Sequence, residues 1–315
     1  GGGGTSPAGL IFGGNPGMLT ATEEWNFTTT LNAGAWASGG NLNTGRGQMG
    51  GTGTQTAGIV FGGIPSQKAV CETYNGSSWT EVGDLNTGAQ YNVGFGTQTA
   101  AVNTNGVVSG GSDTDNTETW DGSSWTTSPA DLNTARQKAS ASNQGTTTAG
   151  LIFAGMTQPP VVTKTITESW NGSAWTEVGD MSTARSAGGG GGTQTAAWIA
   201  GGHTGGAYPV NFESFNGTSW TEGADINTGR EGTGSAGITT EALIYGGTLG
   251  SGPRAETEHF DGTSWSEVAN LATAAEGKAK GLGTYSLALG VGHDGPPNTV
   301  TEEWTVTRNI KVITD

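Results

Sequence analysis

The chain has 315 residues, 59 of them glycine, and its 27 Asp and Glu outnumber its 12 Lys and Arg, which gives a formal net charge of −15. This charge works against binding to nucleic acid or anionic membranes, and no apolar run approaches the ~18–20 residues that span a bilayer. The single cysteine, Cys71, excludes an internal disulfide, so packing and hydrogen bonding must hold the fold together.

One unit is copied along almost the entire chain, at a spacing of roughly 44–49 residues, within the ~40–50 typical of propeller repeats. An apolar run ends in a glycine pair at 10–14, 59–63, 107–111, 151–155, 198–202 and 243–247, with a degenerate copy at 287–291. A Glu-x-aromatic motif follows each run, from Glu23/Trp25 to Glu302/Trp304. A second tryptophan comes next, at Trp36, Trp79, Trp125, Trp175, Trp220 and Trp265. Counting the first two landmarks gives seven units.

Each unit is predicted to form four antiparallel strands. In the second unit, GTQTA (53–57) is a turn, AGIVF is a buried strand, AVCETY alternates, and Asn75-Gly76 is a strong hairpin signal before the returning strand SSWTEV. Cys71 is expected to be a half-buried strand residue. A four-stranded sheet cannot bury both of its faces alone, so the units are expected to stack around an axis.

The predicted fold is therefore an all-β, seven-bladed β-propeller that forms a single domain over 1–315, with blades at 1–45, 46–88, 89–135, 136–184, 185–229, 230–274 and 275–315. Small residues dominate the innermost strands, which predicts a narrow channel. The alternating tail around Ile310, Val312 and Thr314 is expected to be the outer strand of the seventh blade. Because the chain begins GGGG without methionine, it is expected to be part of a longer or processed chain.

The Glu of the repeated motif would be costly to bury unpaired. Pairing with the Arg that opens the same unit is predicted for Arg46 with Glu72, Arg136 with Glu168, Arg185 with Glu213, and Arg230 with Glu258. Where alanine replaces the arginine, Glu118 and Glu302 must find backbone N–H donors or water; a surface position for all these glutamates is the alternative. Structural roles are also assigned to Trp79, Trp125, Trp175, Trp220 and Trp265.

An apolar run with Gly-Gly, an aromatic residue, a spaced tryptophan and an opening arginine together resemble the kelch repeat, over essentially the full chain. That resemblance implies a β-propeller of kelch-like blades. The wording ETWDGSSW, DLNTAR and GTQTA also resembles kelch-like proteins of marine bacteriophages. The second resemblance implies a virion protein of a tail or capsid appendage.

No catalytic, metal or cofactor site is expected. Asp121-Gly122 and Asp261-Gly262 lack the spacing of a sialidase Asp-box, and the three histidines lie in different units without ligand spacing. The sequons at Asn75, Asn171 and Asn216 occupy positions where other units hold Asp, so turn chemistry explains them. A calcium site at Asp113, Asp115 and Glu118 lacks a full oxygen cage.

The segments between the glycine pair and the Glu differ from unit to unit, and strand alternation places them on one face of the disk. Loops on a rigid scaffold are the usual place for recognition. This face is the predicted binding surface, although drift would also explain the divergence. It is represented by Pro159, Pro160, His203, Tyr208, Arg254 and His293.

Taken together, these features predict a non-enzymatic phage virion protein that recognises other virion proteins, or a glycan or protein of the host surface. Localisation on the particle surface is expected, without nucleic acid or membrane insertion, and a homo-oligomer within an assembly stays open. A carbohydrate-active or oxidase-type propeller enzyme and a cellular kelch scaffold are the alternatives. Acids clustered in the channel would favour an enzyme, but only Glu231 and Glu276 open inner strands, and neither has a second carboxylate nearby in its own repeat.

Overall fold

The computed structural model describes residues 2–5, 8–12, 22–26, 33–296 and 298–307. The chain divides into two compact units, Gly1–Ala33 with Val306–Asp315, and Gly34–Thr305. In the first unit, the described residues form an antiparallel sheet in the order β1 (Gly2–Thr5), β2 (Ala8–Phe12), β3 (Thr22–Asn26). No described helix is long and apolar enough to cross a membrane.

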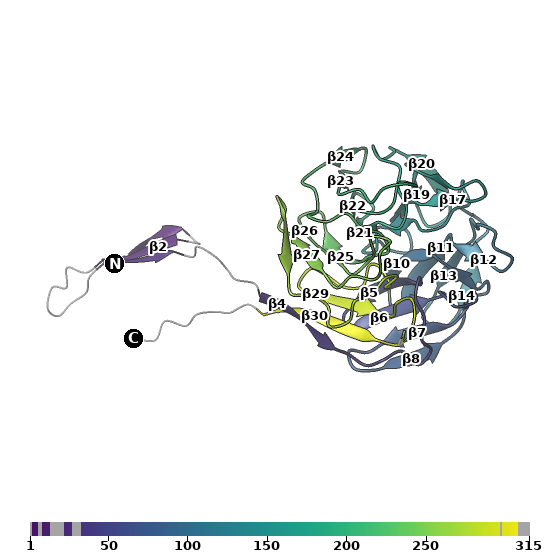
Figure 1. Ribbon diagram of the computed structural model, residues 1–315, viewed down its shortest axis with the longest axis horizontal. Coiled ribbons are helices and arrows are strands. Elements are labelled where there is room, and N and C mark those ends of the chain that lie inside the picture. Colours follow the sequence, from purple (N-terminus) through teal and green to yellow (C-terminus); the bar gives the residue numbers. More distant parts are fainter. Residues whose placement is uncertain (1, 6–7, 13–21, 27–32, 297, 308–315) are drawn as a thin grey trace. The chain divides into compact units, whose positions relative to one another are not determined.

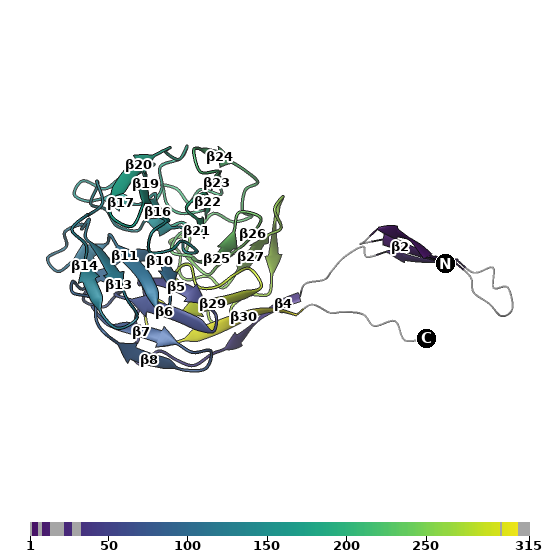
Figure 2. The same ribbon diagram turned by 180° about the vertical axis from the view of Figure 1, so that it is seen from behind.

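The second unit is a β-propeller of six blades, so the prediction of seven was wrong (Figure 1). Five blades are four-stranded antiparallel meanders whose first strands contact one another around the axis. The predicted meander within each unit is therefore confirmed for these blades. Figure 2 shows the same ring from behind.

The bounds of the strands follow, blade by blade. The first two blades contain β5 (Gly50–Thr54), β6 (Ala57–Phe61), β7 (Cys71–Tyr74) and β8 (Trp79–Val82), then β10 (Val93–Thr97), β11 (Ala100–Thr104), β13 (Thr117–Trp120) and β14 (Trp125–Thr127). The third and fourth contain β15 (Ser140–Ala141), β16 (Gly150–Phe153), β19 (Thr167–Trp170) and β20 (Trp175–Val178), then β21 (Gly189–Thr193), β22 (Ala196–Ala200), β23 (Phe212–Phe215) and β24 (Trp220–Glu222). The fifth contains β25 (Gly234–Ile238), β26 (Glu241–Tyr245), β27 (Thr257–Phe260) and β28 (Trp265–Val268), and short pairs join β9 (Ala89–Gln90) to β12 (Val107–Val108) and β17 (Met156–Thr157) to β18 (Val162–Thr163).

The sixth blade closes the ring with a strand from the other end of the sequence. Its sheet has the order β29 (Leu287–Val291), β30 (Thr301–Thr307), β4 (Ala33–Ser38). Its innermost segment runs along β29, with hydrogen bonds from Ala279 N–H to Val291 O and from Leu289 N–H to Leu282 O, both 3.0 Å. The outermost described strand of the last blade is thus β4, and the predicted tail strand around Ile310, Val312 and Thr314 lies outside the described residues.

Trp36 on β4 explains the blade count. In the five complete blades, the outer-strand tryptophan packs on the aromatic residue of its own third strand, as in Tyr74–Trp79, with centroids 4.8 Å apart. Trp36 packs in the same way on Trp304 of β30, at 5.5 Å. The sequence has six such tryptophans, one for each blade, whereas the motif at Glu23/Trp25 belongs to β3 in the other unit.

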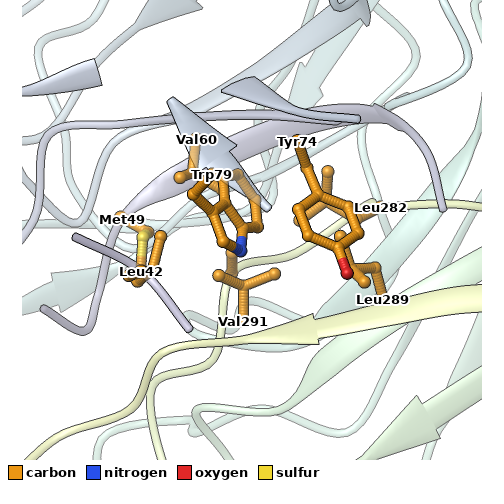
Figure 3. Close-up of a cluster of buried hydrophobic side chains, with 9 residues drawn as sticks. Leu42, Met49, Val60, Tyr74, Trp79, Leu282, Leu289 and Val291 are labelled. Carbon is orange, nitrogen blue, oxygen red and sulfur yellow. The ribbon is translucent and has the colours of Figure 1, made fainter. Parts of the chain in front are cut away.

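Large apolar side chains fill the space between neighbouring blades. Figure 3 shows the cluster at the closure, where side chains of the sixth blade meet those of the first. Its members, all buried, are Leu42, Met49, Val60, Tyr74, Trp79, Ala279, Leu282, Leu289 and Val291. Burial of one such Leu or Val side chain stabilises the fold by about 1.5–3 kcal/mol, so the seam is held by packing as well as by β4.

The four predicted Arg–Glu pairs all form and are buried. Glu72 Oε1 lies 2.6 Å from Arg46 Nη1, and Glu72 Oε2 accepts hydrogen bonds from Asn43 N–H (2.8 Å) and Nδ2 (3.0 Å). Glu118 and Glu302 accept backbone N–H groups, from Asn86 and Ala272 at 2.8 and 2.9 Å. The carboxylate thus ties the connection between two blades to the third strand of the second.

Four of the six outer-strand tryptophans also hydrogen-bond to the preceding blade, whereas the indole N–H groups of Trp125 and Trp265 have no hydrogen-bond partner among the described residues. The indole N–H of Trp175 donates to Thr117 Oγ1 at 3.0 Å, and the same bond joins Trp36 to Thr257, Trp79 to Thr301 and Trp220 to Thr167. At Trp125 the equivalent partner position holds Cys71, which is fully buried and not half-buried as predicted. Burial raises the pKa of its thiol to about 12. Cys71 is therefore a variant of this threonine position.

Candidate functional site

The antiparallel meander gives the ring two different faces. One face is formed by the connections between second and third strands, and we term it the variable-loop face. These connections are 64–70, 109–116, 156–166, 203–211, 248–256, and 292–296 with 298–300. The tight turns between first and second strands, 53–57, 96–100, 145–149, 192–196, 237–241 and 283–287, lie on the opposite, turn face. There the predicted Asx turns are present, with Asn75 Oδ1 accepting the N–H groups of Ser77 and Ser78 at 3.0 and 2.9 Å.

A closed ring of backbone hydrogen bonds surrounds the axis on the variable-loop face. Each blade contributes one residue at positive φ, two positions after the repeated Arg or its Ala replacement, and each N–H donates to the carbonyl of the preceding blade at 2.7–3.3 Å. These residues are Gln48, Tyr91, Lys138, Ala187, Gly232 and Gly277. Four of the six are not glycine, and left-handed backbone costs such residues on the order of 1 kcal/mol or more. We term this ring, with the side chains above it, the axial mouth.

The side chains at the axial mouth are charged and polar. Lys138 Nζ lies 4.9 Å from the centroid of the Tyr91 ring, a cation–π contact. Gln48 Nε2 donates to Asp294 Oδ2 at 2.6 Å. Asp294 covers the ring because Gly277, at φ +72°, leaves it room: a Cβ there would lie 2.5 Å from Asp294 Oδ1.

Three half-buried carboxylates, Glu231, Glu276 and Asp294, share the axial mouth. Burial, together with the charges of Asp294 and Glu231, raises the pKa of Glu276 above its usual range. Burial likewise raises the pKa of Asp294, against the hydrogen bond from Gln48 and the charge of Lys138. None of the three forms an ion pair with any residue that the structure describes. The mouth therefore concentrates negative charge that lacks a close cationic partner.

Below the mouth, the channel is narrow, as the small inner-strand residues predict. Two cavities on the axis have volumes of about 20 and 10 Å³, and Lys280 lines both. Lys280 Nζ donates to Ala139 O at 3.1 Å, and burial together with the charge of Lys138 lowers the pKa of its ammonium group to about 7. Each cavity has room for about one water molecule, so a larger ligand would have to bind at the ends of the channel.

The six residues predicted for binding are spread around the variable-loop face rather than gathered in one site. Pro159 and Pro160 lie exposed at the tip of the β17–β18 hairpin, and the rings of His203 and Tyr208 are 5.2 Å apart in one loop. Arg254 pairs with Glu256, and His293 is only 5% exposed. Their role in binding stays a prediction.

The axial mouth, by contrast, was not predicted as a site. Glu231 and Glu276 were recognised as residues that open inner strands, but Tyr91, Lys138 and Asp294 were not. Alignment of the units on the repeated arginine would have shown the signal, because the column two residues further on changes from Gln to Tyr, Lys, Ala and Gly. A position that varies between units, beside one that is almost constant, is a position where the fold does not require a particular side chain.

The mouth does not provide a metal centre among the described residues, where no group of three or more His, Cys, Asp or Glu could hold an ion. The acidic run considered for calcium is engaged otherwise: Asp113 accepts hydrogen bonds from Gln137 Nε2 at 2.8 Å and from Gln158 N–H at 2.7 Å.

No family model matches the chain, and no curated protein matches it. The structure shows a β-propeller that is built from repeats and has four-stranded antiparallel blades. A β-propeller fold suggests a scaffold for protein–protein interaction.

Proposed function

We propose that this protein is a non-enzymatic recognition module that binds a partner protein with its variable-loop face, and that a basic segment of the partner contacts the axial mouth. The observation that carries the proposal is the group of carboxylates at the mouth. The raised pKa values of Glu276 and Asp294 mean that the free protein holds these two charges at a cost, which a Lys or Arg side chain of a partner would offset.

The position of the mouth supports the same proposal. It lies on the axis of the face whose loops differ most between blades, on a backbone ring fixed by six hydrogen bonds. A rigid centre surrounded by divergent loops is the arrangement expected of a recognition surface. Complementary charge at its centre would increase the association rate and favour basic partners.

A peptide-display selection on the immobilised protein tests this function. Selected peptides should be enriched in Lys and Arg, and the double substitution Glu276→Gln with Asp294→Asn should weaken their binding about tenfold or more. The matched control is Glu81→Gln with Glu177→Gln, which removes the same charge from exposed positions on outer strands. Peptides that bind both double variants equally well would contradict the proposal.

The resemblance to kelch-like proteins of marine bacteriophages supports a more specific version, in which the module is displayed on a virion and recognises another virion protein or a glycan of the host surface. The measurement is saturable binding to intact bacterial cells and to a glycan array. Replacing the loops 156–167 and 203–212 by glycine-serine should abolish this binding. A folded protein that binds neither cells nor glycans would contradict the proposal that the module recognises the host surface.

One observation favours an enzyme as a second candidate: Asp294 joins Glu231 and Glu276, so the acids at the channel end are more numerous than the inner strands alone indicated. A carboxyl group with a raised pKa near a second carboxylate is the arrangement of a general acid with its partner. Release of reducing ends from a panel of oligosaccharides, lost in Glu276→Gln, would establish hydrolysis. Absence of release with the wild-type protein would reject it.

A further inference from the structure

The turn face also carries a pre-formed depression at the axis, with a volume of about 500 Å³. This volume falls within the ~300–1,000 Å³ of small-molecule sites. Its walls come from the first, second, third and sixth blades. Each of these blades contributes an exposed threonine at an equivalent turn position, namely Thr54, Thr97, Thr146 and Thr284. The depression lies at the opposite end of the channel from the axial mouth.

The third blade makes this end of the axis different from the rest of the ring. Its segment from Lys138 to Thr146 is two residues longer than the equivalent segment from Tyr91 to Thr97. The longer segment brings Asn143 and Gln144 to the wall of the depression. Asn143 also lines the narrow channel, so it forms the floor between the two spaces.

Asn143 has hydrogen-bonding capacity that the described part of the chain does not use. It is 3% exposed, and its Oδ1 accepts the N–H of Gly192 at 3.1 Å, whereas its Nδ2 has no partner among the described residues. A buried amide donor without an acceptor costs about 1–3 kcal/mol. This amide nitrogen packs against Gly281 of the narrow channel, so a molecule in the depression contacts the neighbouring Gln144 and the exposed threonines instead.

The chemistry of the wall indicates the class of ligand. Among the described residues, no charged side chain lines the depression, although the whole chain carries a net charge of −15. The wall offers hydroxyl groups, the amides of Asn143 and Gln144, and apolar surface from threonine methyl groups and backbone. Such a wall suits a neutral molecule that has hydroxyl groups on its edge and C–H groups on its faces.

We propose that the depression on the turn face binds a neutral saccharide. The threonine hydroxyls and the amide of Gln144 bond the hydroxyl groups on the edge of the sugar. This site is separate from the axial mouth and does not depend on the function proposed for the variable-loop face.

Saturation-transfer difference NMR with glucose, galactose, mannose and N-acetylglucosamine, and with glucuronate and glucosamine as charged controls, tests the proposal. A neutral sugar should give a saturable signal that weakens about tenfold or more in Thr97→Trp, which fills the depression. The matched control is Thr193→Trp, at the equivalent turn position of the fourth blade outside the depression, and it should bind like the wild type.

Two further variants separate the outcomes. Gln144→Ala removes an amide from the wall of the depression, so it should weaken binding. Glu276→Gln with Asp294→Asn should leave sugar binding unchanged, which keeps this site distinct from the proposed partner-binding face. The proposal is overturned if no neutral sugar gives a saturable signal with folded wild-type protein, if Thr97→Trp binds as well as the wild type, or if a charged sugar binds more tightly.

Discussion

The buried Glu of each blade is stabilised by a set of donors rather than by one charge. Removing a carboxylate and an ammonium or guanidinium group from water costs several kcal/mol for each ion, and one contact at hydrogen-bond distance does not offset this. Glu72 therefore also accepts N–H groups of Asn43 and Thr44. Glu118 shows that backbone and amide donors suffice without arginine.

Glu168→Gln should lower the free energy of unfolding by about 3–5 kcal/mol, because it leaves Arg136 buried without a counter-charge. Its neighbour in register, Glu177, is exposed on β20, and Glu177→Gln should change stability by less than about 0.5 kcal/mol. The urea midpoints of the two variants and the wild type provide the measurement. Equal midpoints for the two variants would show that the buried pair contributes nothing specific.

Cys71 predicts a pH dependence. Its pKa is about 12 in the folded protein against an ordinary value of 9.0, so the folded state holds the thiol proton more tightly. The contribution to stability is fully present below about pH 9 and is lost as the pH rises toward 12. Cys71→Thr removes this titration and gives the Trp125 indole a hydroxyl acceptor like that of Trp175. The difference in unfolding midpoint between wild type and variant should therefore grow from about pH 8 to about pH 10.5 in favour of the variant. A constant difference would contradict the assigned burial.

At the scale of the strand, β4 pairs with β30, which comes from the other end of the chain. Gly39 N–H, just after β4, donates to Thr301 O at 2.9 Å, and Trp36 reaches Thr257 of the preceding blade. β4 completes the sixth blade. It contacts the fifth blade in the same way as the outer strands of other blades contact the blade before them.

Trp36→Ala should destabilise the ring by about 3–5 kcal/mol and open the seam, since a large side chain leaves the interface. Hydrogen exchange at the Gly39 amide should accelerate strongly. Trp220→Ala removes an equivalent side chain far from the seam, so Gly39 should stay protected in that control. An unprotected Gly39 amide in the wild type would mean that β4 does not close the ring.

The repeat made the four-stranded blade, the Arg–Glu pairs and the narrow channel predictable, because each depends on contacts within a unit or between adjacent units. The number of blades was not predictable from glycine pairs, since one set of landmarks lies on β1–β3 outside the ring. Counting outer-strand tryptophans such as Trp36 gives six, because every interface needs one. The mouth was missed because residues from all six blades meet there, and Asp294 reaches it from a loop.

At the scale of the whole molecule, charge is distributed unevenly between the ends of the axis. The axial mouth holds carboxylates that repel one another, whereas the depression on the turn face is lined without charge. Exposed glutamates such as Glu81, Glu177 and Glu267 lie on the outer strands, where like charges discourage edge-to-edge pairing of rings. The carboxylates of the axial mouth therefore lower the stability of the fold at the end of the axis where the loops are most diverse.

Glu276→Gln should stabilise the protein at neutral pH. The pKa of this carboxyl group is raised in the folded state, so its ionisation favours unfolding. Below the pKa of the unfolded state the group is protonated in both states and costs no stability. As the pH rises through the pKa of the folded state, the stability of the wild type falls. The gain in thermal midpoint should be clear at about pH 7 and vanish near about pH 4. A gain of equal size at both pH values would point to packing instead of charge.

The closure by β4 has a consequence for synthesis. On the ribosome β4 emerges before any blade of the ring, whereas β30, its partner, emerges after all the others. The five complete blades can form from hairpins as they appear, but the seam joins the most distant segments of the ring and should be the slowest step. Until then, Trp36 and the edge of β4 stay uncovered in the nascent chain. Translation must therefore reach Thr301 before the ring can close, and chains stalled earlier are expected to be the species that chaperones bind and proteases remove.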